Sequence, residues 1–547
     1  MRRVWLTSWL IVCAASAGSV AACSGDNGAT PDRLLADDGG VFDGAGPTVE
    51  GGGGDARTEA AVDDGGTGPA TIKPGAPERI LLLGTVIGPD AAFLGQVLVE
   101  GERITCVAPG GACQNEPGAN GATIIDTNGI IAPGMIDTHN HILFDIFDGD
   151  DWTPTTSFAD HNAWTSDNHY VAVLDTKQCI GNDSQGRPAW CPVAYQGAGS
   201  VKCEMNKWGE LKGLVAGTTS IVGLAGAQLK CYASLARTLD GPQNDLKVNS
   251  AGVDRIATSA LFPPSNPAGT CAAIANGTTK SFLVHCGEGK DQAAHDELTT
   301  LSNASGGCLL APQTAITHAT AFDAAQLAMM GTKGMKITWS PTSNVGLYGI
   351  TADIPTALAN GILVALAPDW SLGGGGQNML DEMRFADAWD NAHFGDKLKS
   401  IDLVAMTTKN AATVAAYDDM IGKLAVGYYA DIAVYGGNRA APYDAVVAAR
   451  PKDVRLTMVG GKVLYGDVQL ASAGPTSPGC EQVTICGATK FLCVAEAATT
   501  DKLDQTHAQI KAALDAALTN TDAVRDPALY GGSAFTFSPL APLAKCN

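Results

Sequence analysis

The chain has 547 residues, of which 56 are acidic and 35 basic, so its formal net charge is −21 and its pI is near 4.7. This balance offers no basic surface to a phosphate backbone, which argues against nucleic acid as a partner. The fifteen cysteines include no C-x-x-C pair, which excludes a zinc ribbon, and so high a count is typical of an exported protein.

The N-terminus has the pattern of a secretory signal. A basic start is followed by an apolar run that ends in V-A-A-C at Cys23, and small residues directly before a cysteine are typical of a lipoprotein cleavage site. We expect residues 1–23 to be a lipoprotein signal peptide and Cys23 to carry lipid, which would anchor the protein in a bacterial cell envelope without crossing a membrane. An ordinary cleaved signal is the alternative.

Residues 24–75 are rich in Gly, Ala and Asp and contain few large apolar side chains. Such a composition cannot bury enough surface to offset its ordering entropy, which predicts a disordered linker. Short β-rich runs follow in residues 76–132 and return in residues 421–470, with Gly, Pro and Asn between them. We expect these two segments to pair into one small β-domain.

Residues 133–420 alternate apolar strand-like runs with helical stretches, which is typical of a parallel sheet with crossover helices. The length of this segment suits a (β/α)8 barrel, an α/β fold. Seven strands can be assigned and the eighth cannot. They are Met135–Asp137, Thr218–Val222, Arg255–Leu261, Ser281–Val284, Ala315–Thr317, Gly334–Trp339 and Ile362–Ala367.

The tail, residues 471–547, contains four cysteines and one amphipathic stretch with Leu503, Ile510, Leu514 and Leu518 at helical spacing. It is predicted to be a cysteine-rich extension tied by disulfides. Elsewhere, local pairs are expected between Cys106 and Cys113 and between Cys179 and Cys191. Removal of the signal and attachment of lipid leave an odd number of cysteines, and we nominate Cys286 as the free thiol.

The run P-G-M-I-D-T-H-N-H carries the strongest chemical signal in the chain. Strand side chains alternate, so His139 and His141 point to the same face. Their Cβ atoms would lie roughly 6 to 7 Å apart, and two imidazoles can close this span onto one ion at about 2.0 to 2.1 Å. Because H-x-H is common by chance, the pair predicts a metal site only together with the motifs that accompany it.

Further polar residues stand at the C-terminal ends of apolar runs, the face on which barrel enzymes build their sites. They are His285 and Glu288 in S-F-L-V-H-C-G-E, His318 in A-I-T-H, Asn344 in K-I-T-W-S-P-T-S-N, and Asp369 in I-L-V-A-L-A-P-D-W-S. The simplest arrangement is one divalent ion with a water in its open position. Its ligands would be His139, His141, His285 and Asp369.

With these motifs the chain resembles the amidohydrolase superfamily, in particular the branch of guanine and cytosine deaminases, triazine hydrolases and imidazolonepropionase. The resemblance runs from Ile80 to about Asp467 and includes G-T-T-S-I-V at 217–222 and I-G-K-L-A-V-G-Y-Y-A-D-I-A-V at 421–434. It implies a (β/α)8 barrel with a small β-sandwich domain formed from the flanking segments. It also implies one metal ion, zinc in preference to iron, on the four ligands named above.

The same resemblance assigns catalytic roles. It implies that Glu288 shuttles protons and that His318 contacts the attacking water or the developing oxyanion. Asp369 can accept the proton of the water while it holds the metal. No lysine is placed to bridge two metals, which favours a mononuclear site, and neither Tyr348 nor Trp370 forms a recognisable base-recognition signature.

The expected function is hydrolysis of a C–N bond in a small molecule, either deamination of a cyclic amidine or opening of a cyclic amide. The alternatives are an exported peptidase-like amidohydrolase that acts on acyl-amino acid or X-Pro bonds, and a surface binding protein without activity. The sequence is compatible with an oligomer. His161 and His169 either line the pocket or lie in a surface loop, and Asn344 is favoured as a residue beside the site.

Overall fold

The computed structural model describes residues 68–183, 186–224, 229–241, 244–246, 255–373, 378–476 and 478–546. The predicted signal peptide and nearly all of the predicted linker lie outside the described residues. Lipid attachment at Cys23 therefore stays a prediction. No helix within the described ranges is long and apolar enough to cross a membrane.

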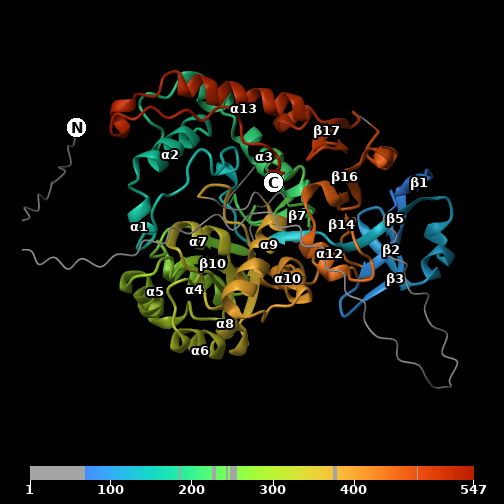
Figure 1. The fold of residues 1–547 in the computed structure, drawn as a ribbon, viewed down its shortest axis with the longest axis horizontal. Coiled ribbons are helices and arrows are strands. Elements are labelled where there is room, and N and C mark those ends of the chain that lie inside the picture. Colours follow the sequence, from blue (N-terminus) through green and yellow to red (C-terminus); the bar gives the residue numbers. More distant parts are fainter. Residues whose placement is uncertain are drawn as a thin grey trace, which may run out of the picture. The chain divides into compact units, whose positions relative to one another are not determined.

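Eight parallel strands form the barrel, of which β7 and β10 are labelled in Figure 1. The strands are β6 (Met135–Asp137), β7 (Thr218–Ile221), β8 (Arg237–Thr238), β9 (Ile256–Ser259), β10 (Ser281–Cys286), β11 (Thr314–His318), β12 (Lys336–Trp339) and β13 (Leu363–Leu366). Pairing links β6, β7 and β8 in one sheet and β9 to β13 in another. A parallel bridge between Asn140 and Asp369 joins the ends of β6 and β13. The predicted (β/α)8 barrel is thus confirmed.

The strand missing from the prediction is β8. It has only two residues, Arg237 and Thr238, too few for an apolar periodicity to be visible. Arg237 is buried at this position because its Nε and Nη2 donate to the carboxylate of Asp431, at 2.8 and 2.9 Å. A buried arginine in a strand is stabilised by such a pair and carries no apolar signal in the sequence.

Helices follow the strands and cover the barrel. They are α3 (Lys202–Leu214), α4 (Pro267–Ala275), α5 (Gln292–Asn303), α6 (Ala324–Thr332), α7 (Pro341–Tyr348), α8 (Ile354–Ala359), α9 (Met379–Trp389), α10 (Ser400–Thr407) and α11 (Lys409–Val414). Local capping defines several starts: Asp291 caps α5, and Asp323 forms a capping box with Gln326 at α6. Between the strands and helices, Val284, Ile316 and Ile337 are fully buried.

The two segments that flank the barrel pair as predicted, because β5 and β14 are antiparallel neighbours. The sheet contains β1 (Thr71–Lys73), β2 (Ala76–Ile87), β3 (Ala92–Glu100), β4 (Arg103–Pro109), β5 (Ala122–Pro133), β14 (Ile432–Tyr435), β15 (Val454–Val459), β16 (Lys462–Asp467), β17 (Glu481–Ile485) and β18 (Ala488–Leu492). Helix α12 (Pro442–Ala448) lies between β14 and β15 in sequence.

Two predicted boundaries need correction. Strand β1 lies inside the predicted linker, since Ile72 pairs with Ile125 of β5 and backbone pairing orders this stretch despite its polar composition. The tail is not a separate appendage, because β18 pairs with β16 and extends the flanking sheet. The predicted amphipathic helix is α13 (His507–Asp522), in which Ile510, Leu514 and Leu518 are buried.

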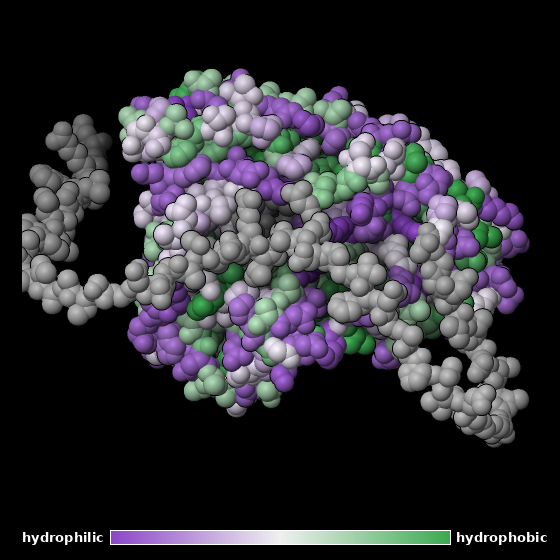
Figure 2. Space-filling model, in the orientation of Figure 1, coloured by the Kyte–Doolittle hydropathy of each residue, from purple (hydrophilic) through white to green (hydrophobic). Residues whose placement is uncertain are grey.

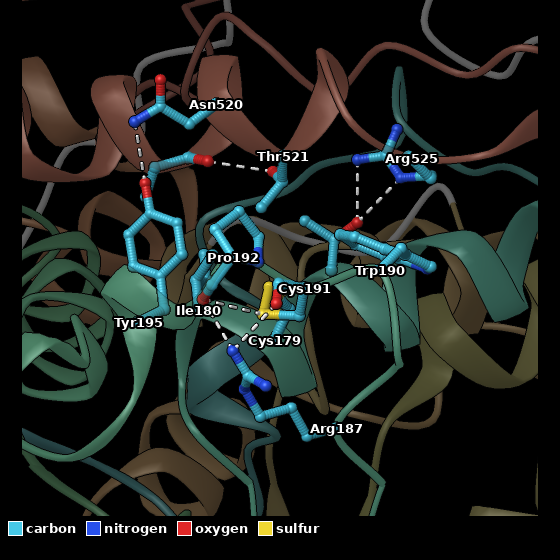
Figure 3. Close-up of a disulfide and its surroundings, with 12 residues drawn as sticks. Cys179, Ile180, Arg187, Trp190, Cys191, Pro192, Tyr195, Asn520, Thr521 and Arg525 are labelled. Atoms are coloured by element: carbon cyan, nitrogen blue, oxygen red, sulfur yellow. Dashed lines mark hydrogen bonds between the residues drawn. A yellow bond between two sulfur atoms is a disulfide. The ribbon is translucent and has the colours of Figure 1, made fainter.

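A long segment separates β6 from β7 and contains α1 (His161–Trp164) and α2 (Asn168–Ile180). The extension packs on it, as Figure 3 shows around the disulfide between Cys179 and Cys191. Asn520 donates to Tyr195, and Arg525 donates to Thr176 of α2. The tail thereby holds the segment that follows the H-x-H motif.

Six disulfides occur among the described residues, and the predicted local pairs are both present. They are Cys106–Cys113, Cys179–Cys191, Cys203–Cys231, Cys271–Cys308, Cys480–Cys493 and Cys486–Cys546. The last two tie the tail, as expected, and Cys286 is the buried free thiol. Hydrophilic and hydrophobic residues are interspersed over the face of the molecule seen in Figure 2.

Candidate active site

The predicted site residues come together at the C-terminal ends of the barrel strands. His139 and His141 follow β6, His285 and His318 close β10 and β11, and Asp369 follows β13. The backbone holds the first and last strands in register here. The amide of His141 donates to the carbonyl of Asp369 at 2.6 Å, and the amide of Asp369 donates to that of His139 at 3.2 Å.

The side chains converge on one carboxylate oxygen. Asp369 Oδ1 lies 2.8 Å from His139 Nε2 and 3.4 Å from His141 Nε2. The ligand atoms of His139, His285, His318 and Asp369 all lie within 4.8 Å of one another, and the rings of His141 and His285 have centroids 5.4 Å apart. The structure therefore brings all four predicted ligands together and adds His318 to the group.

Three atoms of this group identify a place for a metal ion. Among the described residues, His139 Nε2, His318 Nε2 and Asp369 Oδ1 are buried and form no hydrogen bond, although the first and last lie only 2.8 Å apart. This arrangement is costly unless something else binds these atoms. Burial lowers the pKa of His139 and of His285 to about 3, so both imidazoles are neutral, the form that binds metal. Nitrogen and carboxylate ligands of this kind suit a divalent ion.

Two of the predicted ligands are oriented by hydrogen bonds to atoms that do not face the other ligands. The ring of His285 contacts the carbonyl of Ser259 through Nδ1, at 3.1 Å. Ser343 donates to Asp369 Oδ2 at 2.6 Å, which leaves Oδ1 toward the histidines. Partners of this kind fix ring and carboxylate orientation in metal sites. Ser343 escaped the sequence analysis, although it stands in the S-P-T-S-N motif that was noted for Asn344.

Glu288 lies next to His318. Its Oε2 is 3.8 Å from His318 Nε2, and its Oε1 accepts a hydrogen bond from the phenol of Tyr348 at 2.7 Å. Trp164 of α1 donates to the same phenol at 2.8 Å. Burial, with the nearby charge of Asp369, raises the pKa of Glu288 to about 8, so its carboxyl is protonated at neutral pH.

The backbone is strained at two site residues. His318 has φ of 77° and Asp369 has φ of 69°, values in the left-handed region that side chains other than glycine seldom adopt. Such strain is retained where the surrounding structure imposes a conformation, and it concentrates at functional positions. Here both bends occur where a strand ends and its side chain turns into the site.

Aromatic side chains from the segment after β6 gather beside the ligands. Trp370 lies 5.7 Å from His141 between ring centroids and packs against a cluster. The other members of the cluster are Phe144, Trp152, Trp164 and Tyr170. These rings, which are tilted relative to Trp370, form an apolar aromatic wall next to the proposed metal position.

The two histidines of this segment are placed differently. His161 contacts Glu297 at 2.7 Å, and the same carboxylate accepts from the amide of Gly287 in the H-C-G-E turn. His161 therefore ties α1 to the turn that carries Glu288. His169 stacks on Phe535 of the tail, with ring centroids 4.0 Å apart, and serves the packing of the extension.

Comparison with known proteins agrees with this geometry. The family model described as "Amidohydrolase family" matches residues 235–464. Over this segment the chain is similar to the amidohydrolase superfamily. A 5-methylthioadenosine/S-adenosylhomocysteine deaminase from Symbiobacterium thermophilum is 25% identical over 71% of this chain and 94% of its own length. A 5'-deoxyadenosine deaminase from Methanothermobacter thermautotrophicus is 22% identical, over 72% and 94%.

Among solved structures, the chain is similar to a variant of the atrazine chlorohydrolase TrzN from Arthrobacter aurescens, complexed with zinc and atraton. The TM-score is 0.53 at 18% identity, over 70% of this chain and 95% of that chain. At this identity the likeness supports the fold. The resemblance predicted from the motifs is confirmed.

Proposed function

We propose that this protein is a metal-dependent hydrolase that deaminates a planar nitrogen heterocycle. The observation that carries the proposal is the convergence of His139, His141, His285 and Asp369 around buried atoms that lack partners, with Glu288 beside them. The relatives that match over nearly their whole length bear names of deaminases acting on adenosine derivatives, which favours deamination over ring opening.

A single zinc ion is the proposed cofactor. Three imidazoles and one carboxylate form a nitrogen-rich set that suits zinc, and zinc is named in the similar TrzN structure. When bound, the ion supplies a water whose pKa is lowered toward about 7. Asp369 Oδ1, which faces the histidines, is placed to accept the proton of that water.

The leaving group needs a proton, and Glu288 is placed to give it. Because Oε1 of Glu288 accepts the phenolic hydrogen of Tyr348, the carboxyl proton is on Oε2, the oxygen that faces His318. From there it can reach the amino nitrogen that departs as ammonia. His318 Nε2, also unpartnered, is placed to stabilise the oxyanion of the tetrahedral state.

The aromatic wall supports a flat substrate. Trp370 and Phe144 present rings beside His141, and Trp152 packs on Trp370; aromatic faces favour stacking with planar rings. A nucleobase or a triazine ring has this shape, whereas the flexible backbone of an acyl-amino acid does not. The wall therefore favours the heterocycle over the peptidase-like alternative.

We further propose that the enzyme works in the bacterial cell envelope, anchored by lipid on Cys23. Six disulfides in the described chain support an oxidising compartment. Growth with radiolabelled palmitate tests the anchor. Label is expected in the membrane-bound wild type and not in Cys23→Ser, and an unlabelled, freely released wild type would contradict it.

The function is tested with purified enzyme, metal analysis and a panel of adenosine derivatives, cytosine, triazines, cyclic amides and X-Pro peptides. Free ammonia with an intact ring is expected from a heterocycle, with one zinc per chain and loss of turnover in Glu288→Gln. A ring-opened acid would point to cyclic amide hydrolysis. Bound metal without turnover of any compound would favour the binding protein.

A further inference from the structure

A chain of hydrogen bonds runs from the barrel wall to the ring of His318. Trp339 Nε1 donates to Thr351 Oγ1 at 2.7 Å, and Thr351 Oγ1 donates to Asn344 Oδ1 at 3.1 Å. The amide nitrogen Nδ2 of Asn344 then lies 2.9 Å from His318 Nδ1. Trp339, Asn344 and His318 are all at most 1% exposed, and Thr351 is half-buried.

Trp339 sets the donor-to-acceptor direction of this series of hydrogen bonds. An indole N–H can only donate, so the hydroxyl of Thr351 accepts from Trp339, and its own proton is free for Asn344 Oδ1, the amide atom that faces it. The oxygen of the Asn344 amide is thereby occupied, and its NH₂ group faces His318. The Nδ1 of His318 must accept this hydrogen bond, because an amide NH₂ has no lone pair to offer.

This direction decides which nitrogen of His318 carries the proton. Because Nδ1 accepts from the amide of Asn344, it carries no hydrogen, and the ring is neutral. A neutral imidazole that accepts at Nδ1 has its hydrogen on Nε2. Nε2 is buried without a hydrogen-bond partner and lies 3.8 Å from Glu288 Oε2, and His318 offers one ring nitrogen to the group of His139, His285 and Asp369.

A protonated Nε2 has no lone pair for a metal ion. Distance alone groups His318 with the metal ligands, but in this tautomer the ring can only donate to an oxygen. We propose that Trp339, Thr351 and Asn344 are positioning residues that hold His318 as a hydrogen-bond donor and keep it out of the metal coordination. The role in turnover rests on the proposed function, whereas the tautomer does not.

Helix α7 connects the relay, the series of hydrogen bonds from Trp339 through Thr351 and Asn344 to His318, with the proposed metal ligands. Ser343 and Asn344 are neighbours in the helix, and Ser343 donates to Asp369 while Asn344 donates to His318. One helix therefore orients a carboxylate that would hold the ion and an imidazole that would not. These two contacts give Ser343 and Asn344 of the S-P-T-S-N motif distinct structural roles at the site.

The test uses Asn344→Asp and Thr351→Val, with Thr351→Ser as the conservative variant. The introduced carboxylate accepts from Nδ1 and should transfer the proton from Nε2 to Nδ1. Thr351→Val removes the hydroxyl that orients the amide, and Thr351→Ser restores it. Thr332→Val is the matched control, since Thr332 is an exposed threonine of α6 whose hydroxyl bonds within its own helix.

Two readouts are needed, and the first requires no substrate. Nitrogen NMR of histidine-labelled protein, with the His318 signals assigned through His318→Gln, distinguishes the two tautomers. Wild type, Thr351→Ser and Thr332→Val should show the proton on Nε2, and Asn344→Asp should show it on Nδ1. Thr351→Val should show a mixture. Metal content should stay at the wild-type level in Thr351→Val.

The second readout is kinetic. Asn344→Asp should lower kcat by about 10²-fold, the effect of losing one oxyanion donor, with a smaller change in KM. Thr351→Val should lower kcat by about 10-fold, and Thr351→Ser should recover it. A wild-type proton on Nδ1, or a Thr351→Val protein with unchanged spectrum and kcat, would overturn the proposal. If no compound is turned over, the proposed function fails and the spectrum still decides the tautomer.

Discussion

Tyr348 donates its phenolic hydrogen to Glu288 Oε1 across 2.7 Å, and this contact joins the candidate proton donor to the segment that covers the site. The phenol in turn accepts from the indole of Trp164 in α1. His161, three residues earlier, holds the same helix to the turn that carries Glu288 through Glu297. The β6–α2 segment is therefore part of the catalytic geometry.

Replacement of Tyr348 tests this connection. In the native enzyme the hydrogen bond from Tyr348 lowers the pKa of Glu288. Tyr348→Phe keeps the ring and removes this hydrogen bond. The pKa should rise further, so the alkaline limb of the kcat profile, expected near pH 8, should move to higher pH. We expect kcat to fall by about 10-fold to 100-fold. Tyr428→Phe, which removes a hydrogen bond to Asp418 far from the site, is the control, and an unshifted profile would contradict the role.

Removal of the hydroxyl of Ser343 should weaken metal binding. Ser343→Ala frees Asp369 Oδ2 from its 2.6 Å hydrogen bond, and the loss of such an outer partner costs about 10-fold to 100-fold in affinity. Competition with a zinc chelator measures the change. Ser533→Ala, at an exposed position of the tail, should bind zinc as the wild type does. Equal affinity of both variants would show that Ser343 has no part in the site.

The aromatic wall predicts a graded loss at Trp370. Its indole N–H is buried without a partner, so Trp370→Phe should raise KM by up to about 10-fold, the value of one hydrogen bond. Trp370→Leu should raise it more, because ring stacking is lost as well. Trp389→Phe is a matched control, since its indole N–H also lacks a partner but lies in α9. Unchanged KM in Trp370→Leu would exclude this ring from substrate binding.

Buried carboxyls predict that stability falls as pH rises. Burial raises the pKa of Glu210 to about 8 from its ordinary 4.5, so the folded chain binds more protons than the unfolded chain between these values. Its stabilising contribution is present below about pH 4.5 and is lost as pH rises through 8. Glu210→Gln should raise the free energy of unfolding at pH 8 by about 2 to 4 kcal/mol and have little effect at pH 4.5.

Thermal midpoints at the two pH values check this prediction. The control is Glu116→Gln at an exposed turn, which should shift neither midpoint. If Glu210→Gln lowered the midpoint at both pH values alike, the hydrogen bonds to Glu210 from Asn206 and the amide of Leu235 would outweigh its burial.

The extension should stabilise the barrel through Arg525. This guanidinium donates to Thr176 of α2, to the carbonyl of Phe535 and to Asp522, and its side chain is only 3% exposed. Arg525→Ala leaves these partners buried and should cost about 3 to 5 kcal/mol in chemical unfolding. Lys511→Ala breaks an exposed pair with Asp515 in α13 and should cost less than about 1 kcal/mol. Equal costs would mean that the tail is only loosely coupled.

Sequence patterns predicted the site best where reactive residues stand at positions that strand geometry alone brings together. His139 and His141 share a face because strand side chains alternate, and His285, His318 and Asp369 follow apolar runs whose ends meet in a parallel barrel. The local disulfides Cys106–Cys113 and Cys179–Cys191 were predictable because few residues separate the partners. The eighth strand was not, because its two residues owe their place to the pair of Arg237 with Asp431.

The sequence by itself determined the superfamily, the barrel and the residues that could bind a metal, because apolar periodicity and the order of the motifs are written along the chain. Only the tertiary structure decided how those residues are supported. The donors to Glu288 and Asp369 and the relay from Trp339 to His318 join side chains from different turns and loops. Hydrogen-bond direction depends on which atoms meet in space, and no spacing in the sequence specifies that.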